Sequence, residues 1–389
     1  MEESRSFLIQ FSKRPKRNVF TTVVILGGII IAFLFAYTAF GEDHEKISLK
    51  QANIIFRHGD KTPTSAYSND PFKEAIFWPE GWGQLTKKGK KQMYQLGELL
   101  RVRYGQFVGP YSLQTVRVDS SDHDRCLQSA GALLAGFFPP QGDQIWNSKL
   151  LWQPVPIHAL PLNSDKLITM RAPCPLYNEE QRSSDKVLAA SYDDKDLYKY
   201  LSEHSGQNVS TLLDVETLFN ILEIEKESGK DLPSWTISVF PEKMKDIAAL
   251  VLASFTNTPL MKRLRGGPLV KEIKTNMESY VSGASKRKLS LYSAHDTTLV
   301  NFRRALGFND FTFKPQLGSA IIVELHVIDN IPQVEFYYLD SYAATATERW
   351  EVPGCPTPCT LDKFSETMAS VVPLDWDAEC QSQEHSSSS

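Results

Sequence analysis

Apolar residues in this chain occur either in short runs, typical of buried strands, or at helical spacing over longer stretches. Helical spacing is found at residues 86–103, where Thr86 stands at the expected cap position, and at residues 122–138. The short runs lie in the first third and the last quarter of the chain, at residues 53–56, 114–118, 320–323 and 334–338. Strands and helices therefore alternate in these two parts, which favours an α/β fold.

The middle of the chain, residues 166–284, differs because charged residues and helical spacing dominate there, for example at 212–227 and 241–255. We expect an α/β core from residues 41–165 and 285–385, with a mixed, mainly parallel sheet flanked by helices. The middle segment is predicted to be a mostly helical cap insertion. Since two crossings connect it to the core, it is expected to cover the active edge of the sheet.

One N-terminal segment, residues 19–40, is apolar and carries no charge. As a helix it is long enough to span a bilayer, which predicts a transmembrane signal-anchor. The basic residues just before it predict that residues 1–18 form a cytosolic tail and that the rest of this single-pass protein is extracellular or luminal. The alternative is a cleaved signal peptide with a processing site near Ala39-Phe40-Gly41, which would make the protein secreted.

Composition adds three points. The 389 residues, 42% of them hydrophobic, can bury a large core, and a formal charge of −4 gives no reason to expect a nucleic-acid partner. Five cysteines in an exported chain predict disulfides, and the spacing of Cys355 and Cys359 suits a small local loop. Asn208 begins an Asn-Val-Ser sequon, which a luminal location would expose to glycosylation.

Two charged turns that follow predicted strands carry the candidate chemistry. The first reads Arg-His-Gly-Asp-Lys-Thr-Pro at residues 57–63, and the second places His295 and Asp296 between a strand and a helix start. Open α/β sheets bind ligands at this edge of their strands. Arg57 can hold a phosphate there, and His58 can attack its phosphorus as a nucleophile.

These two turns resemble the motifs of the histidine acid phosphatase family, which includes the prostatic and lysosomal acid phosphatases and, more broadly, phytases. The family motifs are Arg-His-Gly-x-Arg-x-Pro and His-Asp. The resemblance covers about residues 47–380 and continues through Gly83-Gln84-Leu85-Thr86, Asp122-His123-Asp124-Arg125, Phe137-Phe138-Pro139-Pro140, Leu151-Trp152-Gln153-Pro154 and Cys355-Pro356-Thr357-Pro358-Cys359.

The resemblance implies an acid phosphatase that hydrolyses phosphate monoesters through a phosphohistidine on His58. Asp296 would donate a proton to the leaving alkoxide and then activate water. Arg57, Lys61 and His295 would bind the phosphate. Neither a metal nor another cofactor is expected.

The resemblance also implies a long-range disulfide between Cys174 and Cys380, beside the local pair Cys355–Cys359. Cys126, on a predicted helix, is then the odd thiol. A homodimer is compatible with the family.

The chain departs from the family pattern at two positions. Lys61 replaces the second Arg of the first motif, and a lysine cannot reproduce the two-pronged contact of a guanidinium. Members of the family carry Arg-Ser-Thr-Asp where this chain has residues 119–122, and that Arg is taken as a third phosphate ligand. This register puts Asp119 at the ligand position, while Arg117, two residues earlier on the same strand face, could substitute if the strand shifted.

Two functions follow from this sequence. The first is an acid phosphatase acting on a small-molecule phosphomonoester or a phosphoprotein. The alternative is a membrane-tethered pseudo-phosphatase, an ectodomain that binds phosphate-bearing ligands with weak turnover. The complete histidine and aspartate motifs favour the enzyme, whereas Lys61 and Asp119 favour the alternative.

Overall fold

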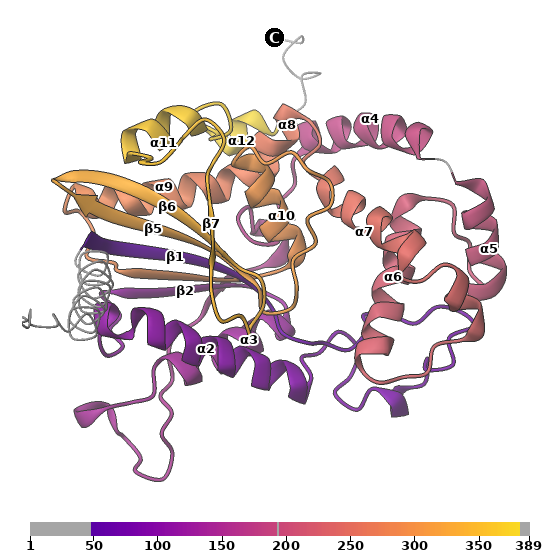
Figure 1. The fold of residues 1–389 in the computed structure, drawn as a ribbon, viewed down its shortest axis with the longest axis horizontal. Coiled ribbons are helices and arrows are strands. Elements are labelled where there is room, and N and C mark those ends of the chain that lie inside the picture. Colours follow the sequence, from indigo (N-terminus) through magenta and orange to yellow (C-terminus); the bar gives the residue numbers. More distant parts are fainter. Residues whose placement is uncertain (1–47, 193, 382–389) are drawn as a thin grey trace, which may run out of the picture. The chain divides into compact units, whose positions relative to one another are not determined.

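The computed structural model of the protein describes residues 48–192 and 194–381, which form a seven-stranded sheet with flanking helices (Figure 1). The strands are β1 (Leu49–Arg57), β2 (Val116–Ser121), β3 (His158–Leu160), β4 (Leu289–Ala294), β5 (Ala320–Ile328), β6 (Ile331–Leu339) and β7 (Glu348–Trp350). The helices are α2 (Lys87–Val108), α3 (Asp124–Phe137), α4 (Pro175–Ser191), α5 (Lys195–Ser205), α6 (Leu212–Glu227), α7 (Glu242–Ser254), α8 (Pro259–Met261), α9 (Gly267–Val281), α10 (Asp296–Ala305), α11 (Leu361–Met368) and α12 (Trp376–Glu379). The prediction of an α/β fold is confirmed.

The sheet is mixed, with the strand order β3-β2-β4-β1-β5-β6-β7. The first four strands in this order pair in parallel, whereas β5, β6 and β7 add three antiparallel pairings. The expectation of a mainly parallel sheet was therefore wrong in that detail. The reason is a tight hairpin between β5 and β6, in which Asp329 and Asn330 adopt φ angles of 51° and 64°. A two-residue turn with both residues left-handed matches the twist of antiparallel strands.

Alternate side chains of β1 enter two different cores, as the period of a strand requires. Ile54 and Phe56 pack with α2 and α3 on one face of the sheet. Ile55 packs with α9, α10 and α11 on the other face. The sheet is thus covered on both sides (Figure 1), and only its edges and strand ends can reach solvent.

The predicted helical segment contains a third core of its own, formed by α5, α6 and α7 and joined by Tyr67. Its buried side chains include Leu201, Val215, Leu218, Leu222 and Met244. The helix α9 behaves differently, because its residues Leu269, Ile273 and Met277 pack on the sheet instead. The segment predicted to extend to residue 284 therefore includes a helix, α9, that packs on the sheet.

Two disulfides link the chain, one across a long stretch of sequence and one within a short loop. Cys174 bonds to Cys380, 206 residues away, and Cys355 bonds to Cys359. Cys126 is a free and buried thiol. The first bridge joins the start of α4 to the end of α12, so it holds the C-terminal segment against the helical part of the chain.

Within residues 48–192 and 194–381, no helix combines the length and the apolar character needed to cross a membrane. The predicted transmembrane segment at residues 19–40 and the predicted cytosolic tail at residues 1–18 lie outside the described residues.

Candidate active site

The sheet brings the two charged turns together at one edge. β1 and β4 are parallel neighbours, and Arg57 at the end of β1 pairs with Ala294 at the end of β4. His58 and His295 therefore leave the sheet side by side, with ring centroids 5.6 Å apart. β2 pairs with the other side of β4, so residues 121–125 follow onto the same edge.

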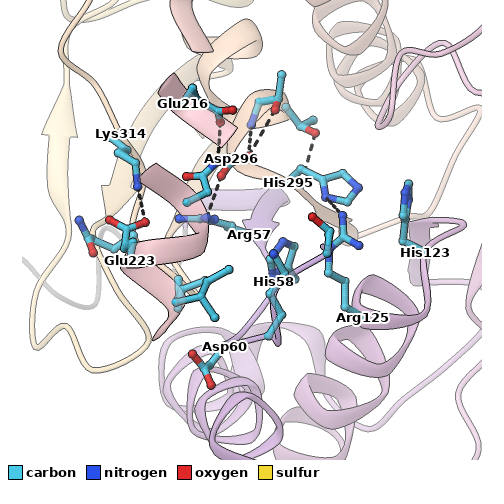
Figure 2. Close-up of a pocket in the computed structure, with 18 of the residues that line it drawn as sticks. Arg57, His58, Asp60, His123, Arg125, Glu216, Glu223, His295, Asp296 and Lys314 are labelled. Atoms are coloured by element: carbon cyan, nitrogen blue, oxygen red, sulfur yellow. Dashed lines mark hydrogen bonds and ion pairs between the residues drawn. The ribbon is translucent and has the colours of Figure 1, made fainter. Parts of the chain in front are cut away.

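A cavity of about 580 Å³ opens at this edge (Figure 2). Its floor consists of residues from the strand ends, including His58, His295 and Asp296. The helix α6 supplies much of another wall through Glu216, Thr217, Asn220, Ile221, Glu223, Ile224 and Glu227. The helix α6 and the strand ends therefore line the same cavity, which has room for a phosphate and an attached alcohol.

His58 is held in the state that a nucleophile needs. Its Nδ1 lies 2.8 Å from the carbonyl oxygen of Gly59, and a carbonyl can only accept, so Nδ1 carries the hydrogen. Burial, together with the nearby Arg125 and Arg57, lowers the pKa of His58 well below its usual value. The imidazole is therefore neutral, and the lone pair of Nε2 is available for attack.

Gly59 holds this turn against α2. A Cβ at Gly59 would lie 2.6 Å from the carbonyl oxygen of Gly89, and one at Gly89 would lie 2.1 Å from the carbonyl oxygen of Asp60. Only two glycines allow the two backbones to approach this closely. Thr86 caps α2 at the same point by accepting a hydrogen bond from the Gly89 backbone at 3.0 Å. The position of His58 therefore depends on backbone packing.

Arg57 and Asp296 form an ion pair across the floor, with Nη2 and Oδ2 2.7 Å apart. Arg57 also donates from Nη1 to the carbonyl oxygen of Pro315 at 2.6 Å. Burial acts to raise the pKa of Asp296, but Arg57, His58 and Lys314 outweigh it and the pKa lies below its usual value. Asp296 is thus ionised in the ligand-free protein.

Arg125, at the start of α3, is the second guanidinium at the cavity floor. It donates to Nδ1 of His295 at 3.3 Å (Figure 2). Within the described part of the chain, the buried Nε atoms of both Arg57 and Arg125 lack a hydrogen-bond partner. Buried donors are rarely left unpaired, so this pair is suited to receive the oxygens of an anion.

Lys61 lines the same cavity. Burial, followed by the charges of Arg125 and Arg57, lowers its pKa to about 8. The third cation of the site is therefore fully charged in acidic solution and loses its charge in mildly alkaline solution.

His295 belongs to a hydrogen-bonded chain of side chains. Its Nδ1 accepts from Arg125, so Nε2 carries the hydrogen and donates to Oγ of Ser121 at 2.8 Å. Ser121 in turn lies 2.9 Å from Nδ1 of His123. Both hydrogen-bonding positions of His295 are thus used inside the protein. Its predicted donation to a phosphoryl oxygen requires the ring to turn or to gain a second proton when an anion binds.

The two residues predicted as a third phosphate ligand, Asp119 and Arg117, lie elsewhere on the sheet. Neither Arg117 nor Asp119 lines the cavity. They pair with each other on β2, with Nη2 and Oδ1 2.8 Å apart. They lie earlier on the strand than its ligand-binding end, whereas Arg125 follows that end and reaches the floor. The sequence offered one signal for Arg125, because it stands at the start of a predicted helix that directly follows a predicted strand, as His295 and Asp296 do.

Comparison with known proteins decides the family. A family model described as histidine phosphatase superfamily (branch 2) matches residues 48–366. The chain belongs to this superfamily branch. Prostatic acid phosphatase of Rattus norvegicus is 38% identical over 343 residues, covering 85% of this chain and 89% of that protein. Lysosomal acid phosphatase of Homo sapiens is 35% identical over 343 residues, covering 86% and 80% respectively. The expectation from the sequence motifs is confirmed, and this branch-2 protein is an enzyme that hydrolyses phosphate monoesters.

Solved structures agree on the fold of this branch-2 phosphatase. The phytase from Citrobacter braakii superposes with a TM-score of 0.63 at 18% identity, covering 86% of this chain and 99% of that one. A Hafnia alvei phytase in complex with myo-inositol hexakis sulphate gives 0.59 at 20% identity, covering 86% and 98%. At such identities the likeness concerns the fold alone.

This phosphatase also gathers three possible metal ligands away from the cavity, namely Glu324, His326 and Glu335, whose ligating atoms lie within 4.8 Å of one another. Two arginine side chains already pair with the carboxylates of this cluster. Arg103 lies 2.9 Å from Glu324, and Arg349 lies 2.7 Å from Glu335. The chemistry of the cluster is that of a structural ion-pair network between β5, β6 and their neighbours.

Proposed function

We propose that the protein is an acid phosphomonoesterase that works through a phosphohistidine on His58. The observation that carries this proposal is the neutral His58, whose Nδ1–H is fixed by a carbonyl, in a cavity that it lines together with the unpaired buried N–H groups of Arg57 and Arg125. Arg57, Arg125 and Lys61 bind the phosphoryl oxygens, and Nε2 of His58 displaces the alkoxide from phosphorus in line.

The substrate itself brings the proton that Asp296 then donates to the leaving group. In the ligand-free protein Asp296 is ionised because Arg57 pairs with it. A bound phosphate competes for Arg57 and adds negative charge, so both changes raise the pKa of Asp296. In acidic solution the ester carries one proton, which passes to the carboxylate and then to the leaving alkoxide. The ionised Asp296 afterwards takes a proton from the water that attacks the phosphohistidine, which releases phosphate and regenerates His58.

Hydrolysis of p-nitrophenyl phosphate against pH tests this function, with activity expected below neutral pH. Arg125→Ala should raise the phosphate inhibition constant by on the order of 30-fold, since a charge-assisted hydrogen bond contributes about 2 kcal/mol or more. Arg117→Ala is the matched control and should change it by less than about twofold, because Arg117 pairs with Asp119 outside the cavity. Phosphate binding without turnover in the unmodified protein would favour the pseudo-phosphatase.

Lys61 is expected to set an upper pH limit for phosphate binding. With a pKa of about 8, its charge is complete in acidic solution and is lost as the pH rises above that value. A guanidinium keeps its charge throughout this range. Lys61→Arg should therefore bind phosphate about tenfold more tightly than the unmodified protein at pH 9 while differing little at pH 5. The inhibition constant of inorganic phosphate, measured at both pH values, checks this, and parallel pH profiles would contradict it.

The helical segment is proposed to act as a cap over the active edge, with α4 to α7 as its body. Supporting observations are the separate core of α5, α6 and α7 and the cavity wall supplied by α6. The substrate class, a small-molecule phosphomonoester or a phosphorylated side chain of a protein, would be selected between this wall and the floor.

Location, attachment and assembly are also proposed. The similarity to lysosomal and prostatic acid phosphatases supports a lysosomal or secretory location, and residues 19–40 would tether the protein to the membrane unless they are cleaved. Asn208 is exposed, as a glycosylated sequon must be. A homodimer is proposed across the edge strand β3, near which Trp146, Leu151 and Leu160 are 58%, 64% and 52% exposed.

A further inference from the structure

One face of α6 forms a polar wall opposite the phosphate-binding floor. Glu216, Asn220, Glu223 and Glu227 follow at intervals of four, three and four residues, so they project from the same side of the helix. All four line the cavity. In Figure 2 the carboxyl group of Glu216 lies on the side of the cavity that Asp296 occupies. Since Asp296 is the proposed proton donor, this is the side where the alcohol leaves.

The three carboxyl groups of this wall are not equivalent. Glu223 is neutralised by Lys314, with Oε2 and Nζ 2.6 Å apart. Glu227 is neutralised by Lys88 at 3.2 Å. Glu216 accepts a hydrogen bond from the neutral amide of Asn220. Within the described residues it takes part in no ion pair, so its charge is the one left to act on a substrate.

The charged groups around Glu216 come from three further elements. Asp296 belongs to α10, Lys61 to the turn after β1, and Lys314 to the segment before β5. Burial and the charge of Asp296 raise the pKa of Glu216 to about 7, against the opposing effects of Asn220, Lys314 and Lys61. A bound phosphate would pair with Lys61, and Lys314 already pairs with Glu223. A cation brought by the substrate is therefore the natural partner of the Glu216 carboxylate.

We propose that Glu216 determines which leaving groups are accepted, and that the protein favours phosphate monoesters whose alcohol carries an ammonium group over esters that carry a second phosphate. An ammonium beside the ester oxygen meets an unpaired, partly buried carboxylate, whereas a second phosphate meets a like charge. The proposal rests on the proposed phosphatase function and adds the class of substrate.

The experiment compares kcat/KM of the full chain for phosphoethanolamine, for propyl phosphate, which is similar in size but neutral, and for ethylene glycol bisphosphate. At pH 7 the ammonium ester should be favoured over propyl phosphate by about tenfold, the size expected of a partly buried charge pair. Glu216→Gln should remove this preference for the ammonium ester. Glu216→Lys should instead favour ethylene glycol bisphosphate over propyl phosphate. Glu203→Gln removes the same charge from an exposed position of α5 and should leave every ratio unchanged.

The pH dependence supplies a test without any substitution. Glu216 gains a proton below its pKa of about 7, so the preference of the unmodified protein for phosphoethanolamine should shrink between pH 7 and pH 5. The proposal would be overturned if the unmodified protein showed the same ratio of kcat/KM between the substrates at both pH values. It would also be overturned if Glu216→Gln and Glu216→Lys changed these ratios by less than twofold. Hydrolysis of p-nitrophenyl phosphate by each variant separates this outcome from a failure of the phosphatase function itself.

Discussion

His58→Ala is expected to abolish turnover. The substitution removes the atom that bonds to phosphorus, so no phosphoenzyme can form, and loss of a nucleophile that acts within a catalytic group costs on the order of 10⁴-fold or more in kcat. Rapid acid quenching after mixing with a ³²P-labelled ester should trap an acid-labile phosphohistidine in the unmodified protein. The same treatment should trap none in the variant.

The matched control for this prediction is His204→Ala. His204 lies on α5 with its ring tilted by 30° against that of Tyr200 and does not line the cavity, so the variant should keep its activity. Equal thermal unfolding of the His58→Ala and unmodified proteins would show that the loss is chemical. Residual phosphoenzyme in His58→Ala would assign the nucleophile to another residue.

Asp296→Asn is expected to slow the hydrolysis of alkyl phosphates by about 10²- to 10⁴-fold, the usual contribution of a general acid. The hydrolysis of aryl phosphates should be slowed far less. A nitrophenolate leaves without a proton, whereas an alkoxide does not. The variant also frees Arg57 from the ion pair that it makes at 2.7 Å in the unmodified protein. Inorganic phosphate should therefore inhibit Asp296→Asn more strongly, a change that a purely structural role would not produce.

The control for Asp296 is Asp119→Asn, which removes a carboxylate that pairs with Arg117 outside the cavity. It should alter neither the ratio of alkyl to aryl hydrolysis nor inhibition by phosphate. If Asp296→Asn slowed both classes of ester to the same extent, the carboxyl group would be needed for structure or for the hydrolysis of the phosphoenzyme, and the proton donor would have to be sought elsewhere.

Local chain chemistry made much of this protein predictable. The helix over Leu212–Glu227 has the predicted bounds, because Thr211 and Asp214 form a capping box at its start. Thr86 likewise caps α2 where the spacing indicated. These features depend on residues three or four positions apart, and for that reason the sequence alone displays them.

The antiparallel half of the sheet and the position of α9 were harder to predict. The Asp329-Asn330 turn is a local hairpin signal, yet whether β5 joins β1 or another strand depends on contacts more than 260 residues apart in sequence. The helix α9 has the same amphipathic pattern whether it packs on the cap or on the sheet. Its placement follows from which apolar face is left uncovered in three dimensions.

The amino-acid sequence determined the nucleophile, its neighbouring guanidinium and the His295-Asp296 pair, because each stands in a contiguous motif that directly follows a strand. Tertiary structure decided the rest of the site. The parallel pairing of β2 with β4 brings the residues after β2 to the cavity, so that Arg125 lines it whereas Arg117 and Asp119 do not. The packing of the helical segment brings Glu216 to the side of Asp296. Strand order and helix docking set such distances, and neither is encoded in the spacing of residues along the chain.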